Sequence, residues 1–291
     1  MRVFVTGGTG FIGKYVVREL LNRKHEVLVL SRSIPGSSDL TAGYIRGDLS
    51  YMSGWSKEVA AFLPEAAIHM AWEGLPDYSS DISAKNAEMG EGLLSFLSGI
   101  KCGKILCAGS CWEYGAYYGA LSEGMEEKAI NDFARAKRRI REFGQKLAED
   151  KGFNFFWARV FYAYGPGQKK GSLIPCMIDR LIKGEEPAIK TPLVKNDFIF
   201  AKDAASAMCD ILEKGEQPGI YNVGSGYSTR VSEIADIIAS EFGMALGRPG
   251  MGHDTTDHDY WADITRIKNK TGWEPRYGIG EGIRETIAGW A

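Results

Sequence analysis

Short apolar segments alternate with amphipathic segments along the first half of the chain. The apolar runs have the length of buried strands, which we expect at residues 2–6, 26–32, 44–48, 65–72, 103–110 and 153–160. Between them, apolar residues recur every three or four positions, which predicts helices at 14–24, 84–99 and 131–144. Strands that alternate with helices predict an α/β fold with a doubly wound parallel sheet.

The second half of the chain shows a different pattern. Helices are expected at 173–187, 230–243 and 280–290, and Ser228 or Thr229 is a candidate cap for the second of these. A single apolar run at 219–226 is typical of a strand that rejoins the main sheet. No linker rich in Pro, Gly or Ser separates the halves. We therefore expect a first domain over 1–160 and a smaller lobe over 161–291, with 196–224 returning to the sheet.

Three glycines follow the first strand directly. Gly7, Gly10 and Gly13 stand in "VTGGTGFIG", between the end of a strand and the start of a helix. In this context the first glycine permits a tight turn, the second lets a pyrophosphate approach the backbone, and the third lets the helix pack on the strand. The free N–H groups of the helix start then face the phosphates. The motif predicts dinucleotide binding in a Rossmann fold.

The end of the second strand indicates which dinucleotide binds. An acidic residue there commonly accepts a hydrogen bond from the ribose 2′-hydroxyl of NAD. This chain has Ser31 and Arg32 instead, which can donate to a 2′-phosphate. NADP is therefore favoured, with NAD as the alternative. Asp48 and Leu49, after the third strand, are expected to flank the adenine.

Charge and composition exclude several classes of protein. The net charge is −2 over 291 residues, with no long run of one sign, so a nucleic-acid partner is not expected. No apolar run is long enough for a membrane span, and the N-terminal residues lack the features of a secretion signal, so we expect a cytoplasmic protein. The five cysteines match no zinc spacing. The cluster "HDTTDHD" (residues 253–259) does not match a common ligand set either, and no metal is expected.

Nine motifs together resemble one known family. In chain order they are "TGGTGFIG", "GDL", "IHMAW", "GSCWEYG", an aromatic-x-x-x-Lys helix, "YGPGQ", "NDFIFAKDAASAM", "YNVGSG" and "TGWEP". Their order is similar to that of the extended short-chain dehydrogenases, a group of nucleotide-sugar epimerases, dehydratases and 4-keto reductases. The resemblance implies a nucleotide-sugar substrate, a possible homodimer, and further dinucleotide contacts at Phe11, Ile12 and Ala71.

The resemblance also implies a catalytic set of Ser or Thr, Tyr and Lys. On this chain the serine is Ser110 and the lysine is Lys137, which would hold the ribose of the nicotinamide. The tyrosine position is residue 133, and it is Phe. A phenyl ring fills the space of a phenol but transfers no proton.

Three explanations of Phe133 remain open. The chain could carry an engineered Tyr→Phe change, or it could be a natural variant in which another group supplies the proton. It could also have lost catalysis and act as a dinucleotide-binding sensor or scaffold. Candidate replacement donors are a water held by Ser110 and Lys137, or one of the phenols Tyr114, Tyr117, Tyr118, Tyr162 and Tyr164.

Departures from the family pattern mark the expected substrate pocket. Trp72, Trp112 and Tyr162 replace residue types common in the family, and Asn196 stands in "NDF" where "RDF" is frequent. Arg180 is a candidate contact of a diphosphate. The NADP preference favours a 4-keto sugar reductase over a 4-epimerase or a dehydratase. A dehydratase usually has an additional acid–base pair, whereas Ser110 is followed by Cys111 and no such pair is apparent.

Overall fold

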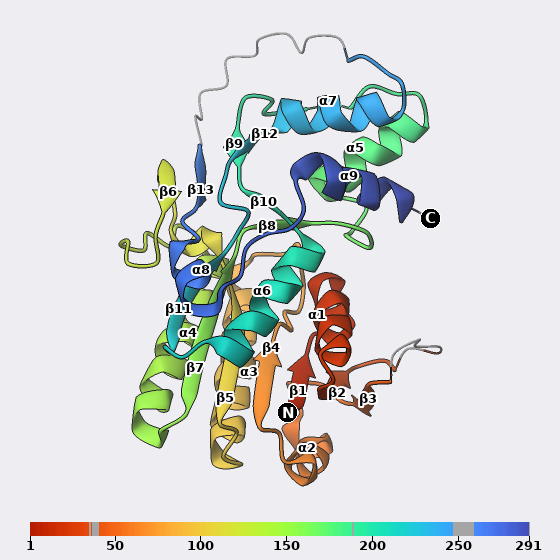
Figure 1. Cartoon of the computed structure of the whole chain (residues 1–291). Helices are drawn as coiled ribbons and strands as arrows, with labels where there is room; N and C mark the ends of the chain where they lie inside the picture. Colours follow the sequence, from red (N-terminus) through yellow and green to blue (C-terminus); the bar gives the residue numbers. More distant parts are fainter. Residues whose placement is uncertain (35, 37–40, 188, 247–258, 291) are drawn as a thin grey trace.

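A seven-stranded parallel sheet forms the centre of the molecule (Figure 1). The computed structural model describes residues 1–34, 36, 41–187, 189–246 and 259–290. The strand order β11-β7-β5-β4-β1-β2-β3 is that of a doubly wound Rossmann sheet, which confirms the predicted fold class. The strands are β1 (Arg2–Thr6), β2 (Glu26–Ser31), β3 (Gly43–Arg46), β4 (Ala66–His69), β5 (Lys104–Ser110), β7 (Asn154–Val160) and β11 (Gly219–Val223).

Two hydrophobic cores lie on opposite faces of this sheet. Alternate side chains of a strand point to opposite faces, so Val3 and Val5 join one core while Phe4 joins the other. The first core is completed by the packed helices α1 (Phe11–Asn22) and α6 (Ala201–Lys214). The second is completed by α2 (Ser56–Phe62), α3 (Ser80–Gly99) and α4 (Asp132–Lys151). Because both faces are covered, the central strands are apolar over most of their length.

A second group of elements lies beyond the carboxyl ends of the strands (Figure 1). Its helices α5 (Leu173–Ile182), α7 (Val231–Glu241) and α9 (Ile279–Ala288) share a separate core. Three two-stranded sheets lie outside the main sheet: β8 (Tyr162–Tyr164) with β10 (Phe198–Phe200), β9 (Lys195–Asn196) with β12 (Thr229–Arg230), and β6 (Gly119–Leu121) with β13 (Tyr260–Ala262). The remaining elements are α8 (Thr265–Thr271) and the 3-10 turns η1 (Met52–Gly54) and η2 (Cys111–Glu113).

Several local expectations need correction. Strand β4 ends at His69, three residues before the expected end, so Ala71 and Trp72 lie in the loop that follows it. Neither Ser228 nor Thr229 caps α7, because both precede its first residue by more than one position and Arg230 takes the cap position without a side-chain bond. Helix α6 was not expected, although it is amphipathic: Lys202, Ser206, Asp210 and Glu213 recur at helical spacing along it.

Candidate active site

A cavity of about 440 Å³ opens at the carboxyl ends of β1, β2 and β4. This is where parallel α/β sheets bind their ligands. Apart from Lys137, every residue expected to contact the dinucleotide lines it: Gly7, Gly10, Phe11, Ile12, Gly13, Ser31, Arg32, Asp48, Leu49 and Ala71. The structure therefore brings together residues from strand ends that are far apart in the sequence.

The glycine turn at the bottom of this cavity leaves no room for side chains. Gly7 has φ +76°, and a Cβ there would lie 2.6 Å from the Ala71 nitrogen. A Cβ on Gly13 would lie 2.0 Å from the Gly7 oxygen. The turn therefore closes tightly against the first turn of α1, whose N–H groups have no partner within the helix. A pyrophosphate fits the chemistry of such a site.

Small polar groups and one cation occupy the end of β2. The Ser31 hydroxyl donates to the Ser33 carbonyl over 2.7 Å and lies 3.3 Å from the Thr9 hydroxyl. Arg32 is exposed and lines the cavity beside Ser31. Across the cavity, the pKa of Asp48 is lowered, first by the hydrogen bonds from Ser50 and to a smaller extent by the charge of Arg32.

Lys137 lies beside the part of the cavity that Ala108 and Trp72 line. Its ammonium donates to the carbonyl of Ala108 over 2.8 Å, and Ala108 lines the cavity. The ammonium also lies 4.2 Å from the ring centroid of Trp72, a cation–π contact. Burial lowers the pKa of Lys137 to about 8, although the Glu113 carboxylate acts in the opposite direction. The same ammonium contributes to the low pKa of His69, which burial brings to about 3.

Phe133 belongs to a cluster of four aromatic side chains. Its ring centroid lies 4.8 Å from that of Trp72, 5.3 Å from that of Tyr78 and 5.7 Å from that of Trp112. Tyr78 and Trp112 also contact each other, with centroids 5.0 Å apart. We refer to Trp72, Tyr78, Trp112 and Phe133 as the aromatic cluster. It gathers two expected substrate residues around position 133, and it adds Tyr78, which the sequence had not indicated.

Most of the phenols considered as replacement donors are engaged elsewhere. Tyr114 is fully buried and donates to the Asn222 side chain over 2.7 Å, and Tyr164 donates to the Ile279 carbonyl. Tyr117 lies under the Lys128 ammonium, and Tyr118 is 65% exposed beside β6. Among these five candidates, Tyr162 alone contacts the aromatic cluster, since its hydroxyl accepts from the Trp112 indole over 3.1 Å. That hydroxyl also bonds to Tyr260 over 2.7 Å, and burial raises the pKa of Tyr162 to about 12.

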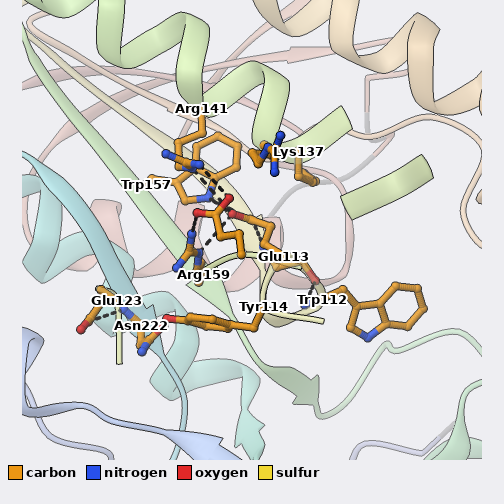
Figure 2. A network of polar contacts seen from close by, with 12 residues as sticks. Trp112, Glu113, Tyr114, Glu123, Lys137, Arg141, Trp157, Arg159 and Asn222 are labelled. Carbon is orange, nitrogen blue, oxygen red and sulfur yellow. Dashed lines mark hydrogen bonds and ion pairs between the residues drawn. The ribbon is translucent and has the colours of Figure 1, made fainter. Parts of the chain in front are cut away.

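Glu113 holds the loop that carries Ser110. Its carboxylate accepts from the Ser110 backbone over 2.7 Å, from the Trp157 indole over 3.0 Å and from Arg159 over 3.1 Å (Figure 2). The Ser110 hydroxyl in turn accepts from the backbone of Trp112 over 3.2 Å. Burial raises the pKa of Glu113, and the Arg159 guanidinium opposes that shift.

A second carboxylate completes this buried network. Glu127 accepts from both Arg159 and Arg141, so two cations and two anions are packed below the loop. Figure 2 shows the Trp112 side chain pointing away from the Glu113 carboxylate and its partners. The glutamate within "WEYG" was the available sequence signal for this network.

Of the five expected substrate residues, Trp72 alone lines the cavity. Trp112 belongs to the aromatic cluster and Tyr162 bonds to it, whereas the other two lie elsewhere. Asn196 pairs with Thr229 between β9 and β12, and the buried side chain next to it is Asp197, which accepts four hydrogen bonds from Ser225, Gly226 and Ala262. Arg180, on α5, donates to the Glu186 carbonyl and pairs with Glu185. Neither Asn196 nor Arg180 lines the cavity described above.

The acidic and histidine-rich segment gives no described metal site. Residues 253–258 lie outside the described part of the chain, and the neighbouring Asp259 pairs with Lys195 and Ser228. Among the residues that the structure describes, no three His, Cys, Asp or Glu side chains are grouped as metal ligands. Within the same residues, no helix is long and apolar enough to cross a bilayer.

Comparison with known proteins agrees with this geometry. Residues 3–224 match the model of the NAD dependent epimerase/dehydratase family, so the chain belongs to that family of enzymes, as the motifs predicted. GDP-6-deoxy-D-mannose reductase of Pseudomonas aeruginosa is 26% identical, and the match covers 99% of this chain and 97% of the relative. dTDP-glucose 4,6-dehydratase of an Actinoplanes species is 25% identical, with the same coverage. The solved UDP-glucose 4-epimerase of Thermus thermophilus, in complex with NAD, superposes with a TM-score of 0.81 at 25% identity over 99% of this chain and 98% of its own.

Proposed function

We propose that this chain is an NADP(H)-dependent nucleotide-sugar oxidoreductase, and specifically a reductase of a 4-keto sugar. One observation carries the cofactor preference: Ser31 and Arg32 line the cavity at the end of β2, where an NAD site would carry an acid. A guanidinium pairs well with a phosphate, so the 2′-phosphate of NADP would be bound there. A reductase that consumes its cofactor would draw on cytoplasmic NADPH.

The glycine turn and Lys137 are the residues that would hold the dinucleotide. The turn can close against the first turn of α1 and the Ala71 backbone only because Gly7 and Gly13 lack side chains. The Trp72 indole N–H is buried and has no hydrogen-bond partner among the described residues, although Trp72 lines the cavity. A ribose or sugar hydroxyl would satisfy it. When bound, the nicotinamide would supply the hydride.

The chain's own residues would position the sugar carbonyl. Ser110 would donate its hydroxyl hydrogen to the carbonyl oxygen. The hydrogen bond from the Ser110 backbone N–H to Glu113 fixes this residue at the end of β5. The buried ammonium of Lys137 would hold the ribose hydroxyls at the side of Ala108. The aromatic cluster would exclude water from the carbonyl. The proposal includes a homodimer through α3 and α4, which pack against each other.

A dehydratase is less well supported. The residue after Ser110 is Cys111, whose thiol is buried and has a pKa well above its usual range because of that burial. Trp112 follows it. Neither side chain can exchange protons near neutral pH, so the acid–base pair of a dehydratase is missing from this loop.

The proposed reaction can be tested with a panel of nucleotide-linked 4-keto sugars. We expect oxidation of NADPH, monitored by its loss of absorbance, together with formation of the reduced sugar nucleotide. NADH should be oxidised more slowly. Interconversion of sugar nucleotides without net consumption of cofactor would support an epimerase instead. Tight NADPH binding without turnover of any sugar would support the sensor.

The pKa of Lys137 predicts how dinucleotide binding depends on pH. Burial lowers that pKa from 10.5 to about 8, so the ammonium that holds the ribose is lost as the pH rises through 8. Between about pH 7 and about pH 9.5 we expect the dissociation constant of NADPH to increase by up to about 30-fold. This factor is the ratio of the protonated fractions of Lys137 at the two pH values, since pH 9.5 lies about 1.5 units above its pKa.

The matched control is Lys137→Met, measured by titration calorimetry at the same pH values. This variant should bind more weakly at neutral pH and should show an affinity that is nearly constant with pH. An equal pH dependence in both proteins would show that another group is responsible.

A further inference from the structure

The aromatic cluster contains one phenol, and it belongs to Tyr78. Tyr78 lies in the loop between β4 and α3, and its ring packs with centroid distances of 5.3 Å to Phe133 and 5.0 Å to Trp112. Trp112 stands two residues after Ser110. The Tyr78 ring is therefore adjacent both to the position where the family has its tyrosine and to the loop that carries the catalytic serine.

The surroundings of Tyr78 differ from those of a tyrosine that serves only packing. The side chain is 38% exposed and belongs to none of the four buried hydrophobic clusters of the described chain. Its hydroxyl makes no hydrogen bond to another described residue, whereas the nearby Tyr162 hydroxyl bonds to both Trp112 and Tyr260. Tyr78 thus presents a free O–H group at the edge of the site.

We propose that Tyr78 is a catalytic residue, which supplies from the β4–α3 loop the proton that a tyrosine at position 133 would otherwise supply. The proposal rests on the reductase function given above. In the step, the carbonyl carbon of the sugar receives the hydride from the bound NADPH, and the carbonyl oxygen takes the proton of the Tyr78 hydroxyl. The products are the sugar alcohol, NADP⁺ and a Tyr78 phenolate, which regains its proton from water.

This assignment gives Tyr78, Phe133 and Trp112 distinct roles. Phe133 packs against the Tyr78 ring in an edge-to-face arrangement, at an interplanar angle of 74°. Trp112 contacts Tyr78 on one side and is tied to Tyr162 through its indole N–H. Because the phenol is partly exposed, solvent can return the proton after each turnover. The substrate carbonyl would then lie between Ser110 and the β4–α3 loop.

Kinetics of phenol variants test the donor role. Tyr78→Phe should lower the rate of keto-sugar reduction by about 10²–10⁴-fold, which is the usual contribution of a positioned acid, and should leave the NADPH dissociation constant within about twofold. Tyr118→Phe removes an exposed phenol outside the aromatic cluster and should change neither quantity. Adding Phe133→Tyr to the Tyr78→Phe protein should raise its rate of keto-sugar reduction at least about tenfold, because the new phenol would be close to Lys137.

A spectroscopic measurement tests the placement without turnover. In protein labelled with ¹³C at the tyrosine Cζ, the signal that disappears in Tyr78→Phe belongs to Tyr78. That signal should move when NADP⁺ and then a sugar nucleotide are added, and the Tyr118 signal should not.

The outcomes separate the two proposals. A wild-type protein that reduces no keto sugar overturns the proposed function and the donor role with it. An active wild type that Tyr78→Phe matches within about threefold overturns the donor role alone. A Tyr78 signal that neither ligand moves also overturns that role, because a proton donor must contact the substrate.

Discussion

Replacing Gly13 by alanine is expected to weaken NADPH binding about 100-fold. The added Cβ would lie 2.0 Å from the Gly7 oxygen and 2.8 Å from the Gly8 Cα, and both neighbours are backbone atoms that cannot rotate away. Overpacking of this kind costs about 1–3 kcal/mol, and rigid neighbours place Gly13 at the upper end. The turn must shift to relieve the clash, and a loss of binding free energy of about the same size corresponds to about two powers of ten in affinity. Titration calorimetry with NADPH measures the change directly.

A matched glycine provides the control. Gly99 ends α3, and a Cβ at that position would meet nothing within 4 Å. Gly99→Ala should therefore bind NADPH as tightly as the wild type and should unfold at the same denaturant concentration or a slightly higher one. Equal affinities for Gly13→Ala and Gly99→Ala would show that the dinucleotide does not depend on the glycine turn.

Removing the Glu113 carboxylate is expected to destabilise the protein by about 3–5 kcal/mol. Glu113 and Arg159 are both fully buried, so Glu113→Ala removes one of the two carboxylates that pair with the Arg159 guanidinium. It also leaves the Ser110 backbone N–H and the Trp157 indole N–H without an acceptor. Urea unfolding, fitted with a common slope, gives the free energy of unfolding of each protein.

Two further variants show how much of this effect comes from charge. Glu113→Gln keeps an acceptor oxygen but removes the negative charge, so its loss should be smaller than that of the alanine variant. Glu149→Ala changes a carboxylate in the last turns of α4, outside the buried network, and should change the free energy of unfolding by less than about 0.5 kcal/mol. If Glu113→Ala and Glu149→Ala are equally stable, the buried network contributes nothing to the fold.

The sheet could be predicted from the sequence because its strands are short, apolar and regularly spaced. β1 begins and ends where the apolar run does, and the glycine turn after it placed the cavity correctly at the carboxyl end of the sheet. Helix α6 could have been predicted, because Lys202, Ser206, Asp210 and Glu213 recur at helical spacing in its sequence. The small sheets β6–β13 and β9–β12 join segments far apart in the chain, and such short strands carry no readable alternation.

The site was predictable only where a family motif fixes a residue to a role. Ser110, Lys137 and position 133 follow from such motifs, and Lys137 and Phe133 both contact Trp72, which lines the cavity. Tyr78 was invisible because its loop has no pattern of its own, and its contact with Phe133 arises only when distant parts of the chain fold together. The partners of Glu113 come from separate elements, so local spacing could not reveal them.

The return of the chain to the edge of the sheet limits how this protein can be divided. Strand β11 pairs along β7, and Trp273, only 4% exposed, belongs to the same core as β1 and donates to Ser206 of α6. A fragment cut after residue 160 would present β7 as an unprotected edge, open to association with other chains. Hybrid enzymes that exchange sugar specificity should therefore replace internal insertions and retain the native chain through Trp273.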